Sequence, residues 1–353
     1  MKNQRRLVFD AFLLSLILLF SCSEEPIHNF ASIDDTVFKP TTSTATNLND
    51  GWVEVLLKDE EQEIIIYLSS LAEGSYKFVP NTSQPFAKDY AVAMVTRGDK
   101  IFTAQSGELK VSNISELEAS FNFIAQYYNR SSNKFEEIKV ERGKFSHLPL
   151  TPLTPDDCLL VKTTDGGTST QFVYDSKKKV VFVIANSYLQ VFKYYQSIVW
   201  PSTLTAQGRV ECYGIYKRCY QYNENGNVIK TYCVDCPRDV LDAEYNGEGN
   251  ITKQSTSFGT NSPTVTSVEY LQYDNKKTPF ALLAKSFGGY VYKFYSVNNA
   301  INALRVPAYQ ISYPPYPVAL NETYMHEYNP AGYPVKTVTS PSGHVITYEY
   351  LCK

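Results

Sequence analysis

Five segments in the second half of the chain repeat one short pattern, and this repetition limits the folds open to it. Each has an aromatic stretch, Tyr-Asp or Tyr-Asn, a short turn and a second strand-like stretch. Asp or Asn starts a turn by accepting backbone hydrogen bonds, and glycine supplies the left-handed residue that closes it. We therefore expect five antiparallel hairpins in a β-meander, with cross-strand pairs of tyrosine rings. The key pairs are Tyr174-Asp175, Tyr222-Asn223, Tyr245-Asn246, Tyr273-Asp274 and Tyr328-Asn329.

The first half is also rich in strand patterns but lacks this repeat. Between Gly51 and Leu150, β-branched and aromatic residues dominate, with Gly, Asn, Asp and Ser between them. Phe121, Phe123 and Ala125 alternate with polar or small neighbours, which predicts a strand with one buried face. The sequence thus predicts an all-β protein, with a β-sandwich or partly closed barrel over residues 51–150 and the hairpin meander over residues 151–353.

Tyrosine content marks the boundary between these halves. Only five of the 28 tyrosines precede residue 151, and the other 23 follow it. The segment Leu148–Asp157 contains three prolines, which suits a linker. Both signals place the domain boundary at residue 150.

The N-terminus has the pattern of an export signal. Lys2, Arg5 and Arg6 precede an apolar run, Ala11–Phe20, as in a secretory signal peptide. A membrane-spanning helix needs about 20 apolar residues, so this run is too short to be one. The signal is assigned to residues 1–21. Residues 22–50 are rich in Thr, Ser and Asn without a hydrophobic period, which predicts a tether.

Short motifs at this end resemble those of bacterial lipoproteins. The motif "LFSC", ending at Cys22, resembles the lipobox, after which the cysteine is acylated. The following "SEEP" resembles the acidic surface-export signal of Bacteroidota lipoproteins. The resemblance implies that acyl chains on Cys22 anchor the protein to the cell outer membrane, exposed at the surface. Two or more chains are needed for stable anchoring.

Both predicted domains resemble parts of the same group of proteins. Residues 51–150 resemble a Bacteroidota lipoprotein domain of unknown function, through motifs within Gly107–Leu150, which implies a β fold and no known activity. Residues 157–353 resemble degenerate Tyr-Asp (YD/RHS-like) repeats, and more closely Bacteroidota lipoprotein repeat domains that open with Cys-x-x-x-Lys and close with Tyr-x-Tyr-x-Cys. The matching residues are Cys158, Lys162, Tyr348, Tyr350 and Cys352.

Apart from Cys22 the chain has six cysteines, and an even number in an exported chain predicts disulfides. Cys158 and Cys352 bracket the repeat region, and the other four flank one hairpin. A fold at Asn225 favours nested pairs, Cys219 with Cys233 and Cys212 with Cys236. A four-cysteine zinc site is the alternative, although only one pair has the close spacing of zinc ribbons. The candidates are Cys158, Cys212, Cys219, Cys233, Cys236 and Cys352.

Charge and motifs narrow the possible functions. Without residues 1–21 the chain has 30 basic and 35 acidic residues, net −5, which argues against nucleic-acid binding. No nucleophile elbow, P-loop or dinucleotide fingerprint is present, so no catalytic residue and no cofactor is predicted. The four histidines show no metal-ligand spacing, and no metal site is predicted. They are His28, His147, His326 and His344.

One segment combines stiffness with aromatic rings. Val306–Tyr324 contains four prolines together with Tyr309, Tyr313 and Tyr316. Tyrosine offers a flat face and a hydroxyl, which suits contact with a glycan or a protein, although the same rings would also suit covering the sheet. The favoured function is non-catalytic binding or scaffolding at the cell surface. The alternative is a surface hydrolase, whose carboxylates would come from distant positions.

Overall fold

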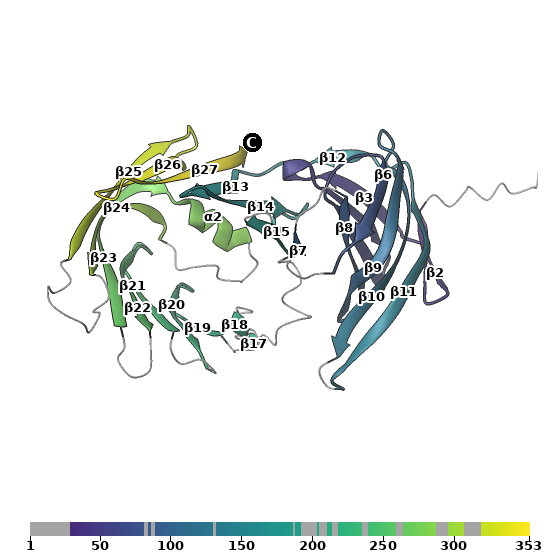
Figure 1. Ribbon diagram of the computed structural model, residues 1–353, viewed down its shortest axis with the longest axis horizontal. Coiled ribbons are helices and arrows are strands. Elements are labelled where there is room, and N and C mark those ends of the chain that lie inside the picture. Colours follow the sequence, from purple (N-terminus) through teal and green to yellow (C-terminus); the bar gives the residue numbers. More distant parts are fainter. Residues whose placement is uncertain are drawn as a thin grey trace, which may run out of the picture.

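The computed structural model confirms the all-β prediction (Figure 1). It describes residues 29–80, 84–85, 89–129, 132–185, 188–191, 203–204, 210–213, 218–234, 239–258, 264–286, 296–306 and 319–353. Within these ranges, two sheets hold all the strands, beside the α-helix α2 (Pro279–Ser286) and the 3₁₀ turn η1 (Asn49–Gly51).

Sheet A is one curled sheet of eleven strands that forms half a barrel (Figure 1). Its order is β12-β3-β4-β5-β8-β6-β9-β10-β11-β1-β2, with a further pairing of β8 and β9. The partly closed barrel is therefore the form that the first domain takes. The strands are β1 (Phe30–Ile33), β2 (Thr36–Phe38), β3 (Thr42–Asn47), β4 (Val53–Lys58), β5 (Gln62–Leu68), β6 (Gly74–Phe78), β8 (Tyr90–Arg97), β9 (Lys100–Asn113), β10 (Glu118–Asn129), β11 (Lys134–Phe145) and β12 (Leu150–Pro152).

The inner face of sheet A is packed with apolar side chains. In β10, Phe121, Phe123 and Ala125 are buried and their neighbours are not, as the alternation predicted. Gly143 of β11 makes room for this packing, since a Cβ there would lie 2.3 Å from the ring of Phe121. Period-two alternation in the sequence thus becomes one continuous core inside the half-barrel.

The predicted tether is wrong for residues 30–47, because β1, β2 and β3 belong to sheet A. Ala31 and Ile33 are fully buried, and Phe38 is 2% exposed. The segment reads as polar because β2 is an edge strand and β3 lies beside the other edge, where Thr and Ser face solvent while retaining strand propensity. The first domain therefore spans residues 30–152, not 51–150.

Sheet B has sixteen strands in the order β17-β18-β19-β20-β21-β22-β23-β24-β25-β26-β27-β13-β14-β15-β16-β7. Its strands are β7 (Gln84–Pro85), β13 (Cys158–Asp165), β14 (Thr168–Tyr174), β15 (Val180–Ala185), β16 (Tyr188–Val191), β17 (Thr203–Leu204), β18 (Val210–Tyr213), β19 (Arg218–Tyr222), β20 (Val228–Cys233), β21 (Asp239–Tyr245), β22 (Ile251–Phe258), β23 (Thr264–Lys277), β24 (Asn298–Val306), β25 (Leu320–Tyr328), β26 (Pro334–Ser340) and β27 (His344–Cys352). Consecutive strands pair from β17 to β27 and from β13 to β16, as the predicted meander requires. The C-terminal strand β27 returns beside β13, and β17 and β7 are the two edges of the sheet.

The two sheets pack on each other through the outer face of β4, β5 and β8. These strands are buried on both faces, which explains the unbroken apolar run in β5. Trp52 packs on Phe182 of β15, with ring centroids 4.4 Å apart. The side chain of Asn49 donates to the carbonyl of Phe172 (2.7 Å) and accepts from the backbone of Tyr174 (3.0 Å).

Four of the five predicted turns form with one hydrogen-bond pattern. In each, the carbonyl of the Asp or Asn accepts from the residue three positions on, and its Oδ1 accepts from the residue four positions on. The residue three positions on is left-handed, with φ of +63° for Lys178, +84° for Gly226, and +83° for Gly249 and Gly332. The turn-forming residues are Asp175, Asn223, Asn246 and Asn329.

The fifth predicted hairpin is wrong. Strand β23 runs through Tyr273 and Asp274 to Lys277, and α2 follows. Pro279 has the fixed φ that suits the first turn of a helix, so a helix and not a second hairpin strand follows β23. The predicted aromatic pairing across strands is found in part. Tyr333, just before β26, pairs with Tyr350 of β27, with ring centroids 5.4 Å apart. Tyr220 and Tyr222 instead pair along β19, with tilted rings 6.5 Å apart.

Candidate functional site

Several residues singled out by the sequence lie outside the described residues. They are Cys22, Cys236, Tyr309, Tyr313 and Tyr316. Lipidation and the role of the tyrosine-proline segment therefore stay predictions.

Cys158 and Cys352 form the predicted disulfide. They lie directly opposite each other in the β13–β27 pair, with Cα atoms 4.1 Å apart. The bond joins the first and last strands of the second unit, across a sequence separation of 194 residues.

The nested pairing of the other cysteines is wrong. Cys212 is bonded to Cys219, its direct partner in the β18–β19 pair. A bulge between Gln221 and Tyr222 shifts the β19–β20 register, so that Tyr232, not Cys233, lies opposite Cys219. Neighbouring residues of a strand point to opposite faces, so this shift turns the thiol of Cys233 away from Cys219.

The Cys212–Cys219 disulfide argues against the alternative of a four-cysteine zinc site. A thiolate is the form in which cysteine binds zinc, and a disulfide has none to offer. With Cys212 and Cys219 bonded, a four-cysteine site cannot form. Cys233 is disulfide-bonded too.

One face of sheet B carries half-buried tyrosines linked to charged side chains. Tyr270 pairs directly with Ala303, and Ala303 pairs with Glu322, so these three side chains lie on the same face of the sheet. Tyr324 stands two residues after Glu322 in the same strand and therefore shares this face. We call this the tyrosine face and define it by Tyr270, Arg305, Glu322, Tyr324 and His326. Alternate residues of β25, from Thr323 to Glu327, point the other way and are exposed.

Hydrogen bonds join the charged groups of the tyrosine face. Arg305 donates from Nε to Oε1 of Glu322 (2.6 Å) and from Nη2 to Oε2 (3.2 Å), a bidentate pair. The hydroxyl of Tyr324 donates to Oε2 of Glu322 (2.6 Å). Burial raises the pKa of Glu322, but the hydrogen bonds from Arg305 and Tyr324 outweigh it, so that the pKa lies below its ordinary value.

The same contacts keep the tyrosine protonated. Burial, followed by the bond to Glu322, raises the pKa of the Tyr324 hydroxyl well above its ordinary value. Nearby in β23, burial raises the pKa of Tyr273 to about 12. These hydroxyls are therefore neutral hydrogen-bonding groups at physiological pH.

The tyrosine-proline segment is attached at this face. Residues 307–318 connect β24 to β25, and Arg305 is the direct strand partner of Leu320 at the base of this connection. The Arg305–Glu322–Tyr324 network therefore lies on the strand ends from which residues 307–318 extend.

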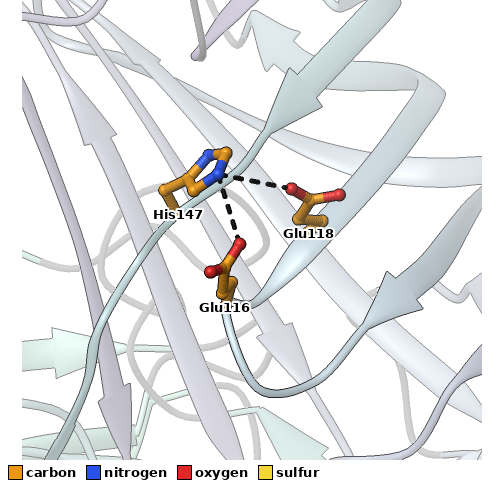
Figure 2. Close-up of side chains that lie close together, drawn as sticks. All are labelled: Glu116, Glu118 and His147. Atoms are coloured by element: carbon orange, nitrogen blue, oxygen red, sulfur yellow. Dashed lines mark ion pairs between the residues drawn. The ribbon is translucent and has the colours of Figure 1, made fainter.

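A second cluster lies at one end of sheet A and combines three metal-ligand side chains (Figure 2). Nε2 of His147 lies 3.2 Å from Oε2 of Glu116 and 3.8 Å from Oε1 of Glu118. The three ligand atoms are all within 4.8 Å of one another. Glu116 lies in the β9–β10 turn, Glu118 begins β10, and His147 follows β11.

Sequence reasoning did not single out this cluster. Two of its ligands form a Glu-x-Glu pair, but the histidine stands 29 residues after Glu118, and no local spacing links them. Only the antiparallel pairing of β10 with β11, which sets Ala119 opposite Phe145, brings His147 to the pair.

Comparison with protein-family models finds a match within the first unit. Residues 30–149 match the model of a domain of unknown function, DUF6252. The match begins at β1 and ends just before β12, which agrees with sheet A as a unit that starts at residue 30. No curated protein matches the sequence.

Among solved structures, a porin-like protein from Bacteroides uniformis ATCC 8492 is similar at 8% sequence identity and a TM-score of 0.27, over 74% of this chain and 96% of that chain. At this TM-score the similarity supports no statement about fold or function. None of the helices in the part of the chain that the structure describes is long and apolar enough to cross a membrane.

Proposed function

We propose that this protein is a lipoprotein of the cell outer membrane, anchored through acyl chains on Cys22 and facing outward. Its second unit, a degenerate Tyr-Asp repeat domain, serves as a non-catalytic binding or scaffolding surface. The ligand is a glycan or a partner protein.

The anchor rests on the N-terminal sequence. A basic start, the ten-residue apolar run Ala11–Phe20 and "LFSC" together form the lipoprotein signal. The assignment to Tyr-Asp repeats is supported by the shared hydrogen-bond pattern of the four turns, each beginning with a Tyr-Asp or Tyr-Asn pair.

The observation that carries the binding role is the tyrosine face at the base of residues 307–318. Tyr324 and Arg305 present hydroxyl and guanidinium groups beside a segment that holds Tyr309, Tyr313 and Tyr316. Aromatic rings with polar groups at their edges recognise sugars and protein surfaces, and proline lowers the entropy lost on binding.

Labelling with a palmitate analogue tests the anchor. The wild-type protein should incorporate the label and fractionate with the outer membrane, and Cys22→Ala should do neither. Protease added to intact cells should degrade the wild-type protein if it faces outward. Wild-type protein without label would overturn the anchor, and resistance to protease would overturn surface exposure.

A glycan array and a surface pull-down test the binding role. Tyr313→Ala and Tyr316→Ala should weaken binding at least about tenfold without lowering the melting temperature, whereas buried rings would cost about 3–5 kcal/mol on truncation. Tyr128→Ala, in sheet A, is the matched control and should bind normally. Unchanged binding in both variants would remove the segment from the contact surface. Cleavage of an arrayed glycan would favour the hydrolase alternative.

A further inference from the structure

The spacing of the Glu116–Glu118–His147 cluster is close to that of a bound metal. In a tetrahedral site with ligand bonds of 2.0–2.2 Å, neighbouring ligand atoms lie about 3.4 Å apart. Nε2 of His147 already lies 3.2 Å and 3.8 Å from its two carboxylate partners. The third separation is within 4.8 Å, so closing the set takes movements of about 1 Å.

The charges of the cluster favour a cation. Two carboxylates converge on one point, and among the described residues His147 is the ion-pair partner of both. Like charges this close repel each other, and a divalent ion would offset both. Glu116 and His147 are 55% and 54% exposed, and Glu118 is 28% exposed, so an ion and its remaining water ligands can enter.

Buried neighbours hold the ligands in place. Leu117, between the two glutamates, is fully buried, and Leu148, after His147, is 3% exposed. The backbone of Leu148 donates to the carbonyl of Glu116 (3.0 Å). The two loops are thus joined by backbone and core contacts that do not involve the ligand atoms, which reduces the ordering cost of binding.

We propose that Glu116, Glu118 and His147 bind one divalent transition-metal ion of the zinc class, with water completing the coordination. Imidazole with two carboxylates suits zinc better than the all-oxygen sets that calcium and magnesium prefer. The ion would tie the β9–β10 turn to the segment after β11. This proposal does not depend on the function of sheet B.

Zinc binding by the full-length mature protein in detergent tests the proposal. The unreduced, chelator-stripped protein is dialysed against zinc, so that disulfide-bonded cysteines do not compete. The wild type should bind one equivalent, and zinc should raise its melting temperature. His147→Asn, in which asparagine tolerates the left-handed φ of +57° at this position, and Glu118→Gln should each weaken binding at least about tenfold.

His344→Asn is the matched control. His344 is 44% exposed and pairs with Asp165 at 2.6 Å, so it reproduces an exposed histidine–carboxylate pair without the third ligand. This variant should bind zinc as the wild type does. Absence of stoichiometric zinc in the wild type, or equal binding by the wild type and His147→Asn, would overturn the site. Melting curves in the presence of chelator show whether each variant is folded.

Discussion

Glu322 is a carboxylate held on a half-buried face, and its partners decide whether it can stay charged there. Its side chain is 13% exposed, and the bidentate Arg305 and the Tyr324 hydroxyl supply hydrogen bonds that solvent does not. Removal of one partner from a buried ion pair leaves a charge without compensation, which costs more than the pair contributes. The stability of the network therefore depends most on Arg305.

We expect Arg305→Ala to lower the free energy of unfolding by about 1–2 kcal/mol at pH 7, since the guanidinium is itself 47% exposed and partly screened. The folded pKa of Glu322 is lowered, so its stabilisation is present above the unfolded pKa of about 4.3 and is lost as pH falls through the folded value. Urea unfolding of wild type and variant should therefore show a gap at pH 7 that narrows below about pH 4.

Lys336→Ala is the control for this prediction. Its partner Glu327 lies on the opposite face of β25 and is 64% exposed, so the loss should stay below about 0.5 kcal/mol. Equal losses for the two variants would mean that the Arg305 network stabilises no more than a surface ion pair. A gap that does not change with pH would show that Glu322 is not the group responsible.

At the scale of the element, the hairpin turn is where the sequence was most informative. Asn329 and its equivalents accept local hydrogen bonds that neighbouring residues alone specify. Features that depend on distant partners are harder to predict, and the Cys158–Cys352 disulfide is an exception because its cysteines stand at the two ends of the repeat region. The polar strand β3, next to the sheet edge, has the composition of a tether, and a bulge after Gln221 moves Cys233 away from Cys219. The Glu116–Glu118–His147 cluster was missed for the same reason.

Gly332→Ala should lower the free energy of unfolding by about 1–2 kcal/mol, because residue 332 has φ of +83°, where a Cβ is costly. The nearest atom to that Cβ would be Cδ of Lys276 at 3.9 Å, so the loss reports backbone strain and not a clash. Thermal unfolding of Gly247→Ala supplies the control. Gly247 has open space and an ordinary φ, and the change there should be neutral or slightly stabilising. If both variants lost the same stability, the left-handed position would not be the cause.

At the scale of the whole molecule, the position at which the N-terminal segment meets sheet A determines which part of the protein lies near the proposed anchor. The amide of Ser146 donates to Oδ1 of Asn29 (3.0 Å), which places the start of the described chain beside His147. Seven peptide steps separate Cys22 from Asn29, a reach of at most about 25 Å. With the proposed anchor, this end of sheet A and its Glu116–Glu118–His147 cluster stand close to the membrane. Along the chain, sheet A then lies between the proposed anchor and most of sheet B.

The two disulfides of sheet B give the last prediction. The disulfide Cys158–Cys352 fixes a loop with a separation of 194 residues, whereas Cys212–Cys219 closes one of 7. Loop-closure entropy grows with the logarithm of length, which gives about 5 kcal/mol for the first bond and about 2.5 kcal/mol for the second. Replacing both members of each pair with alanine should therefore cost more at Cys158–Cys352, measured by urea unfolding of the mature protein without reductant. Thiol titration of the unfolded, unreduced wild type should find no free thiol among these four cysteines. If the Cys158–Cys352 variant lost no more stability than the Cys212–Cys219 variant, the β13–β27 hydrogen bonds alone would hold these two strands together.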